Sequence, residues 1–246
     1  MGMPLRASTR SLPDGSPLHN RLLAALPSTD YARVVKHLRL KRVVTGDTLQ
    51  DTGSRITEVY FPNGGVFSVT NQMRDGALVE VATIGREGML GIGAFFGDRT
   101  AAGRTFQQVA NGGSLPSMAV ARFIEETDAP GPFREVIGVY AQANLLQIMQ
   151  CTACNALHDV KQRCCRWLLQ THDRVDGDDF LLKQEFLAIM LGVQRPTVTV
   201  VLRTLQRAGF VSSRYGRIRI LKRKRLEAAS CECHEVIQGH FARLGL

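Results

Sequence analysis

Residues 183–220 read KQEFLAIMLGVQRPTVTVVLRTLQRAGFVSSRYGRIRI and contain the most informative pattern of the chain. The first part of this stretch predicts a short helix over residues 184–191, with four apolar side chains pointing inward: Phe186, Leu187, Met190 and Leu191. Gly192 and Val193 form a turn. Arg195-Pro196 opens a second helix, because proline suits a first-turn position whose N–H needs no partner. That helix runs to about Ala208 and buries a stripe at helical spacing: Val198, Val201, Leu202 and Leu205.

A basic hairpin follows the second helix. Gly209 ends the helix as its C-cap, and residues 211–220 have the pattern of a strand, a glycine turn and a strand. Helix, glycine turn, helix and basic hairpin, in this order, are typical of a winged helix-turn-helix. The sequence therefore predicts a domain that binds double-stranded DNA. A winged fold used only for protein contacts is the alternative.

Positive charge is concentrated in the same region. The 246 residues carry a formal net charge of +9. Residues 183–225 hold eleven Lys and Arg against the single acid Glu185, which is +10 and leaves −1 for the rest of the chain. A basic excess confined to one window is typical of a surface that binds phosphates. A solvated basic face without a partner is the alternative.

The second helix is predicted to enter a major groove with its first turn against the base edges. Arg195 is the candidate for direct reading, because its guanidinium matches the two acceptors of guanine. Gln194 and Thr199 are candidates for further base contacts. The other DNA-binding candidates are better suited to phosphates or lie further along the helix: Lys183, Gln184, Thr197, Arg203, Arg214 and Arg217.

A β-rich region lies nearer the N-terminus. Residues 1–20 are rich in Pro, Ser and Gly, which predicts a flexible tail, and the leucines of residues 20–26 predict a short helix. Between residues 43 and 113, glycines separate short segments rich in β-branched and aromatic residues, at 57–61, 66–70 and 78–82. Asn63-Gly64 and Asp75-Gly76 are hairpin signals. These features predict a small antiparallel sandwich or barrel.

The strand at 78–82 shows alternation. Its residues Glu80 and Ala82 are expected to face away from Val79 and Val81.

Residues 133–158 predict one long helix, since they contain no proline and no glycine after Gly138. A stripe recurs at three- and four-residue steps: Phe133, Ile137, Tyr140, Asn144, Gln147, Cys151 and Cys154. One small barrel cannot cover so long a helix, so we expect a second copy of it to pack against part of the stripe and form a homodimer. Packing within its own chain is the alternative. Asp159 and Gln162 predict a capping box at the start of the next helix.

A β-rich sensor, a long helix and a winged helix-turn-helix, in that order, resemble the bacterial Crp/Fnr family of transcription regulators. The most specific stretches are residues 171–175 and 184–193, which look like a subgroup without an assigned cyclic-nucleotide effector. The resemblance implies an α+β fold of four parts after the tail: an N-terminal antiparallel β-roll like a cyclic-nucleotide-binding domain (21–128), a dimerisation helix (129–158), a winged helix-turn-helix (159–228) and a C-terminal tail (229–246).

The same resemblance implies a function. It implies a homodimer that binds an inverted-repeat DNA site and changes its DNA affinity when the β-roll senses a signal. An activator of this kind would also contact RNA polymerase.

The resemblance also implies an effector-binding site in the β-roll, although several residues here differ from those of the cyclic-AMP-binding members. Cyclic-AMP-binding members hold the ribose with a Gly-Glu pair and the phosphate with an Arg-Ser pair. Here the first place reads Gly91-Ile92, without the carboxylate, and Arg104-Thr105 resembles the second pair but is displaced along the chain. Ile148-Met149 stand where those members have adenine-binding hydroxyl residues. Gly91, Arg104 and Thr105 are therefore the ligand-binding candidates, for a small-molecule effector that stays unidentified.

Six cysteines, at positions 151, 154, 164, 165, 231 and 233, are too few for a disulfide scaffold and fit a cytoplasmic location. We interpret Cys151, Cys154 and Cys164 as packing residues, and Cys231 and Cys233 as accessible thiols. The six histidines show no ligand spacing, so no metal and no cofactor is predicted. Two alternatives stay open: a redox or metal-sensing regulator that uses its cysteines, and a cyclic-nucleotide-binding regulatory protein that contacts protein rather than DNA.

Composition and motifs exclude other classes. The chain is 44% hydrophobic and 22% charged, which is ordinary for a globular protein. It has neither a run of eighteen apolar residues nor a signal-peptide pattern, so no membrane partner is predicted. It also has no Gly-x-Ser-x-Gly, no Walker loop and no His-Glu-x-x-His, so the sequence predicts a regulator and not an enzyme.

Overall fold

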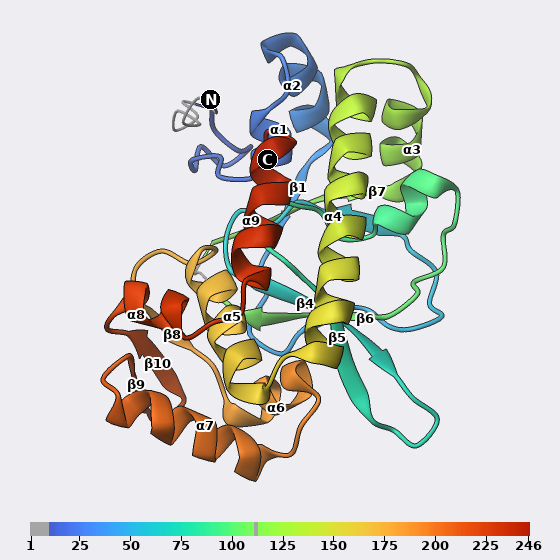
Figure 1. Ribbon diagram of the computed structural model, residues 1–246. Coiled ribbons are helices and arrows are strands. Elements are labelled where there is room, and N and C mark those ends of the chain that lie inside the picture. The colour runs from blue at the N-terminus through green and yellow to red at the C-terminus, as the bar shows by residue number, and fades with distance from the viewer. Residues whose placement is uncertain (1–9, 111–112) are drawn as a thin grey trace.

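The computed structural model describes residues 10–110 and 113–246. An N-terminal β-roll, a long helix and a C-terminal winged domain follow one another along the chain, and the winged domain lies at one end of the long helix (Figure 1). The predicted α+β fold with a β-roll and a helix-turn-helix is confirmed.

Two antiparallel sheets build the β-roll. One has the strand order β1-β7-β3, with β1 at Arg39–Lys41, β7 at Leu115–Ala119 and β3 at Glu58–Tyr60. The other has the order β2-β6-β4-β5, with β2 at Thr48–Gln50, β6 at Arg104–Val109, β4 at Val66–Gln72 and β5 at Leu78–Ile84. The strands predicted at 57–61, 66–70 and 78–82 are β3, β4 and β5.

One of the two predicted hairpins forms. The β4–β5 hairpin turns at Asp75-Gly76, where Gly76 has φ +86°. The hairpin predicted at Asn63-Gly64 is wrong, because β3 and β4 lie in different sheets and the chain crosses between them there. The Asn63 carboxamide instead holds the N-terminal segment: its Oδ1 accepts from the backbone N–H groups of His19 (2.6 Å) and Asn20 (3.1 Å).

The N-terminal segment packs against the β-roll. Helix α1 (Arg21–Ala24) confirms the predicted short helix, and its N-cap Asn20 also donates to the carbonyls of Pro62 and Gly88 at 2.9 Å each. Helix α2 (Ser28–Val34) and the 3₁₀ turn η1 (Val35–His37) follow. Of the predicted flexible tail, residues 1–9 lie outside the described residues. Residues 10–20 contradict it, because Leu12 and Leu18 are buried in the core with α1.

The long helix is α4 (Pro132–Leu157), which follows the 3₁₀ turn η2 (Ile92–Phe96) and helix α3 (Val120–Asp128). Six of the seven residues of its predicted stripe are buried within their own chain: Phe133, Ile137, Tyr140, Gln147, Cys151 and Cys154. Tyr140, for example, donates its hydroxyl to the carbonyl of Met89 at 2.9 Å. The stripe itself is therefore packed in its own chain, and other side chains of α4 are exposed.

Helix α5 (Val160–His172) opens the winged domain and has the predicted capping box. Asp159 Oδ1 accepts from the Gln162 N–H at 2.9 Å, and Gln162 Oε1 accepts from the Asp159 N–H at 3.2 Å. The remaining elements of the domain are β8 (Asp179–Leu181), α6 (Gln184–Leu191), α7 (Arg195–Arg207), β9 (Val211–Arg214), β10 (Arg217–Ile220) and α8 (Arg223–Ala228). The strands form one antiparallel sheet, ordered β8-β10-β9.

The polar face of β5 is the one that the winged domain covers. Glu80 is 9% exposed and Ala82 4%, whereas Val79 and Val81 are only half-buried. The Glu80 carboxylate accepts from the Trp167 indole N–H of α5 at 2.9 Å and from the Ser68 hydroxyl of β4 at 2.7 Å. Alternation in sequence identified the two faces of the strand but not which of them is buried.

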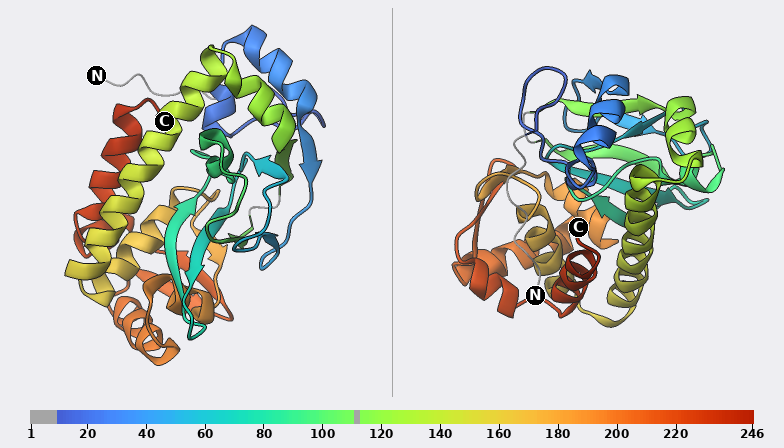
Figure 2. Two further views of the ribbon diagram at one scale, coloured as in Figure 1. Left: turned by 90° about the vertical axis from the view of Figure 1, so that its right-hand side faces the viewer. Right: turned by 90° about the horizontal axis from the view of Figure 1, so that it is seen from above.

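The last residues form a helix, which corrects the predicted C-terminal tail. Helix α9 (Cys233–Arg243) runs beside α4 and against α5, as two views show (Figure 1 and Figure 2). Its residues Ile237 and Phe241 are buried in the core shared by α1 and α4. The buried side chains of α9 recur at helical spacing (Cys233, His234, Ile237 and Phe241), a pattern that was not recognised in the sequence.

Candidate nucleic-acid interface

The helix-turn-helix has the geometry expected of a DNA reader. Helices α6 and α7 meet at 103°, and Gly192 between them has φ +60°, a conformation that favours glycine. The buried stripe of α7 is the predicted one: Val198, Val201, Leu202 and Leu205. Among the described residues no single helix is long and apolar enough to cross a bilayer, and the one bent pair that passes this test is α6 with α7.

The first turn of α7 is open to solvent. Gln194 is its N-cap, and Gln194, Arg195 and Thr197 all reach solvent. The Arg195 side chain is 64% exposed, and its Nε lies 3.2 Å from Glu185 Oε1. An exposed ion pair of this kind is weak, so it leaves the guanidinium available to a stronger acceptor.

Two predicted contact residues bind each other. Thr199 donates its hydroxyl to Gln184 Oε1 at 2.7 Å, which links α7 to the start of α6. Lys183 is the exposed N-cap of α6, and Arg203 is exposed further along α7. The structure therefore brings Gln184 and Thr199 together and leaves Lys183 and Arg203 accessible to a phosphate.

The wing carries its charge at the tip. Arg214 and Arg217 are exposed at the facing ends of β9 and β10, and Arg217 Nη1 lies 3.3 Å from Asp179 Oδ2. Between them Tyr215 is fully exposed and has φ +50°, which a tight two-residue turn requires. Tyr215 was not among the residues predicted from the sequence to contact DNA. A tyrosine followed by glycine in a basic hairpin is the signal that could have identified it.

Gly91, Arg104 and Thr105 line neither of two cavities formed by the described residues, the one beside Glu87 and Arg174 and the one beside Arg42 and Gln107. Gly91 and Thr105 both flank Gln50: a Cβ on Gly91 would lie 3.1 Å from Gln50 Nε2, and Thr105 pairs with Gln50 across β2 and β6. Arg104 is exposed and donates to Thr48 Oγ1 at 2.7 Å. Gln50 fills the space between them, so ligand binding at Gly91, Arg104 and Thr105 stays a prediction.

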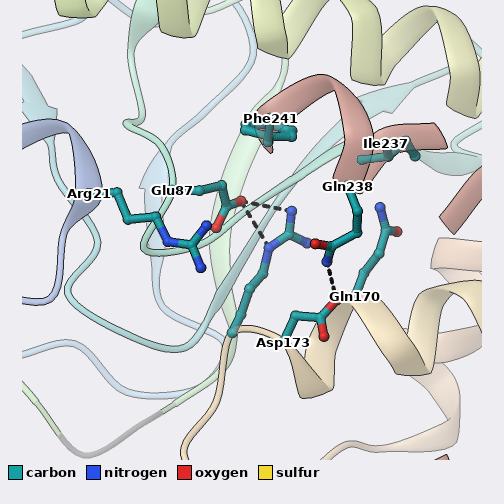
Figure 3. A pocket seen from close by; sticks show the side chains of 8 residues that line it. Arg21, Glu87, Gln170, Asp173, Ile237, Gln238 and Phe241 are labelled. Carbon is teal, nitrogen blue, oxygen red and sulfur yellow. Dashed lines mark hydrogen bonds and ion pairs between the residues drawn. The ribbon is translucent and has the colours of Figure 1, made fainter. Parts of the chain in front are cut away.

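A polar cavity of about 170 Å³ lies where the β-roll, α5 and α9 meet, and Figure 3 shows its side chains converging from these elements. On one wall Arg174, from the loop after α5, forms a buried ion pair with Glu87 at 2.7 Å. Burial alone would raise the pKa of Glu87, but the guanidinium of Arg174 outweighs it and holds that pKa below its usual value. On the other wall Gln238 of α9 donates to Asp173.

Arg174 joins three parts of the fold. Its Nη1 donates to Thr83 Oγ1 at 2.7 Å and its Nη2 to Thr83 O at 3.2 Å, both at the end of β5. Its Nη2 also lies 3.4 Å from Gln147 Oε1 of α4. Gly85 makes this approach feasible, since a Cβ there would lie 2.6 Å from the Arg174 side chain. Arg174 is thus one buried link between the winged domain and the β-roll, beside the hydrogen bond from Trp167 to Glu80.

An exposed cationic recognition helix and a basic wing, on a helix-turn-helix of this geometry, define a winged helix-turn-helix DNA-binding protein. The comparisons agree with this class. A family model, the Crp-like helix-turn-helix domain, matches residues 162–229. No curated protein matches the sequence.

Solved structures share the fold. A CRP-family transcriptional regulator from Thermus thermophilus is 17% identical, with 77% of this chain and 96% of that chain covered and a TM-score of 0.65. FixK2 from Bradyrhizobium japonicum is 12% identical, with 79% and 98% covered and a TM-score of 0.66. The c-di-GMP-responsive global regulator CLP from Xanthomonas campestris is 19% identical, with 79% and 99% covered and a TM-score of 0.63. Residues 162–229 thus match a Crp-like helix-turn-helix domain, and the chain shares the fold of these solved regulators.

Proposed function

We propose that the protein is a homodimer that binds an inverted-repeat DNA site through two copies of α7 and changes its DNA affinity in response to a signal in the β-roll. The observation that carries the proposal is the exposed first turn of α7, which presents Gln194, Arg195 and Thr197 to solvent beside a wing of the same charge. Arg195 is the base-reading residue in this proposal. Lys183, Arg214 and Arg217 bind phosphates.

A second copy of α4 is the partner proposed for the dimer. On the face away from its buried stripe, apolar side chains follow at steps of four, four and three residues: Leu145, Met149, Ala153 and Ala156. The two largest are well exposed, Leu145 at 58% and Met149 at 60%. Such spacing is that of a coiled-coil seam, and two helices packed along it would set two recognition helices about 34 Å apart.

Selection of bound fragments from genomic DNA tests the proposal. The wild-type protein should enrich fragments that share an inverted repeat, and Arg195→Ala should lose discrimination at one base pair in each half, by about 1–3 kcal/mol. Arg122→Ala is the matched control, because it removes the same charge from an exposed arginine of α3 outside the winged domain. Enrichment of a shared site by Arg195→Ala with unchanged base preference would show that α7 does not read the groove as proposed.

A further inference from the structure

Four side chains able to ligate a metal meet where α9 begins beside the end of α4. Cys154 and His158 lie four residues apart at the end of α4, and Cys231 and Cys233 flank the start of α9. The thiol sulfurs and one imidazole nitrogen all lie within 4.8 Å of one another. Cys154 Sγ is 3.5 Å from Cys231 Sγ, and Cys233 Sγ is 3.5 Å from His158 Nδ1.

The separations fit a single tetrahedral ion. With zinc–sulfur bonds of about 2.3 Å, the sulfurs of a tetrahedral site lie about 3.8 Å apart. A cluster of several iron atoms distributes its ligands over those atoms and needs them further apart. Three thiolates and one imidazole are a standard ligand set of structural zinc sites. The expectation that Cys231 and Cys233 are accessible thiols is wrong, because both are buried against the end of α4. Cys154, Cys231 and Cys233 are at most 4% exposed, so a bound ion would be shielded from solvent.

The outer contacts also suit a metal. His158 turns its second nitrogen, Nε2, toward Glu232 Oε2 at 3.2 Å, and a carboxylate in that place fixes the tautomer that leaves Nδ1 free to ligate. Gln150 donates its Nε2 to Cys233 Sγ at 3.0 Å, a contact that stabilises a thiolate. The cluster thus has partners on both its imidazole and its sulfur side.

A buried cation lies beside the cluster. Arg166 of α5 is 5% exposed; it donates to Gln170 Oε1 at 2.8 Å, and its Nε is buried without a hydrogen-bond partner among the described residues. The groups whose negative charge would act on Arg166 are, in decreasing order, Cys151, Cys154, Glu80 and Cys231, so two of the four belong to the cluster. Three thiolates around Zn²⁺ carry a net charge of −1, which would balance the guanidinium. Without them a buried guanidinium is costly.

We propose that Cys154, His158, Cys231 and Cys233 bind one Zn²⁺ ion that fastens the C-terminal segment to the long helix. On binding, each of the three thiols releases its proton to solvent. The ion holds the start of α9, whose next turns carry the His234 contact to Asp173 (2.9 Å) and the buried Ile237. From the sequence no metal was predicted, because the cysteines were interpreted as packing residues or accessible thiols and the histidines showed no ligand spacing; a cysteine-based metal sensor was left as an alternative. The four-residue spacing of Cys154 and His158 was not recognised.

Zinc content and cobalt spectra test the proposal on the full chain. Protein purified anaerobically with a reductant should hold one Zn²⁺ per chain, measured by elemental analysis. Replacement of the zinc by Co²⁺ should give the visible bands of a tetrahedral site and a thiolate-to-cobalt charge-transfer band near the ultraviolet. Either metal-free protein that takes up neither ion, or a Cys154–Cys231 disulfide in place of the metal, would overturn the proposal.

Substitutions distinguish a zinc site from a group of cysteines that only pack against one another. Cys231→Ser and Cys233→Ser should lose the ion or lower the charge-transfer intensity, whereas Cys164→Ala, a buried cysteine of α5 outside the cluster, should keep one ion per chain. Glu232→Gln should weaken zinc binding by about 10- to 100-fold, because it removes the histidine's outer partner.

His158→Cys tests the site without removing a ligand, so its result is not confused with loss of the fold. It keeps four ligands, so it should bind Co²⁺ with a stronger charge-transfer band than the wild type. An unchanged spectrum in both His158→Cys and Cys233→Ser would show that the metal binds elsewhere and would refute the assignment.

Discussion

Glu80 lies buried between the β-roll and α5, and its titration can be followed from the tryptophan that binds it. Burial raises the pKa of Glu80 from 4.5 to about 7, against the opposing hydrogen bonds from Ser68 and Trp167. A rise of that size lowers the free energy of unfolding by about 3 kcal/mol at a pH where Glu80 is ionised in both the folded and the unfolded chain. The perturbation is Glu80→Gln, which keeps the shape of the side chain without its charge. Its amide oxygen can accept from the Trp167 indole N–H, and its Nε2 would donate to the Ser68 hydroxyl, which donates to Glu80 in the wild type.

The raised pKa of Glu80 determines the direction in which stability changes with pH. Below pH 4.5 Glu80 is protonated in the folded and the unfolded chain, so it adds no pH dependence. Between pH 4.5 and about 7 the unfolded chain releases the proton and the folded chain keeps it, so stability falls as pH rises. Above about pH 7 the loss is complete. The free energy of unfolding of Glu80→Gln, relative to that of the wild type, should therefore increase by about 2–3 kcal/mol as the pH rises from about 5 to about 8.

Trp167 is the single tryptophan of the chain and donates its indole N–H to Glu80, which makes its fluorescence a local probe. Emission of the folded wild type should titrate with a midpoint near pH 7, and Glu80→Gln should abolish that titration. Glu125→Gln, at an exposed position of α3, is the control and should leave it unchanged. A midpoint near 4.5, or a midpoint near 7 that persists in Glu80→Gln, would refute the reasoning.

Three further outcomes are expected. Met149→Glu places a charge on the exposed apolar face of α4 and should turn a dimer into a monomer in sedimentation; a monomeric wild type would remove the basis of this prediction. Asp159→Ala removes the capping box of α5 and should cost about 1 kcal/mol in denaturant unfolding, whereas Asp98→Ala, at an exposed position of the β-roll, should cost less. In a plot of the logarithm of the DNA-binding constant against the logarithm of the salt concentration, Arg214→Ala should reduce the magnitude of the slope by about 1 for each wing bound to DNA. An unchanged slope would show that the wing does not contact phosphates.

The winged domain could be predicted from sequence because its determinants are local. Gly192 at the turn, the stripe from Val198 to Leu205 and the Asp159–Gln162 box each lie within a few residues of their partners. The β-roll was predictable as a class, but Asn63-Gly64 was misassigned, since a turn dipeptide does not reveal which sheet the next strand joins.

The parts of the fold and of the candidate sites that the sequence did not predict depend on contacts between residues far apart in the chain. His158 meets Cys233 across 75 residues, and Glu80 meets Trp167 across 87, so no local pattern joins them. Likewise, only the packing of the α4 stripe against the β-roll and α9 shows that Leu145, Met149 and Leu157 are the large apolar side chains of this helix left exposed. The base-reading role of Arg195 stays a prediction, although the structure leaves its side chain exposed.

The bonds of Arg174 have a consequence for how a signal could travel. A guanidinium that lost Glu87 and Thr83 while still enclosed would forfeit about 3–5 kcal/mol, so orientations part-way out of this socket are scarcely populated. We therefore expect the Arg174 link to be either fully formed or fully broken, with few intermediate arrangements. In the proposed regulator, a signal at the β-roll would then change the fraction of molecules in which this link is broken rather than the angle of the winged domain.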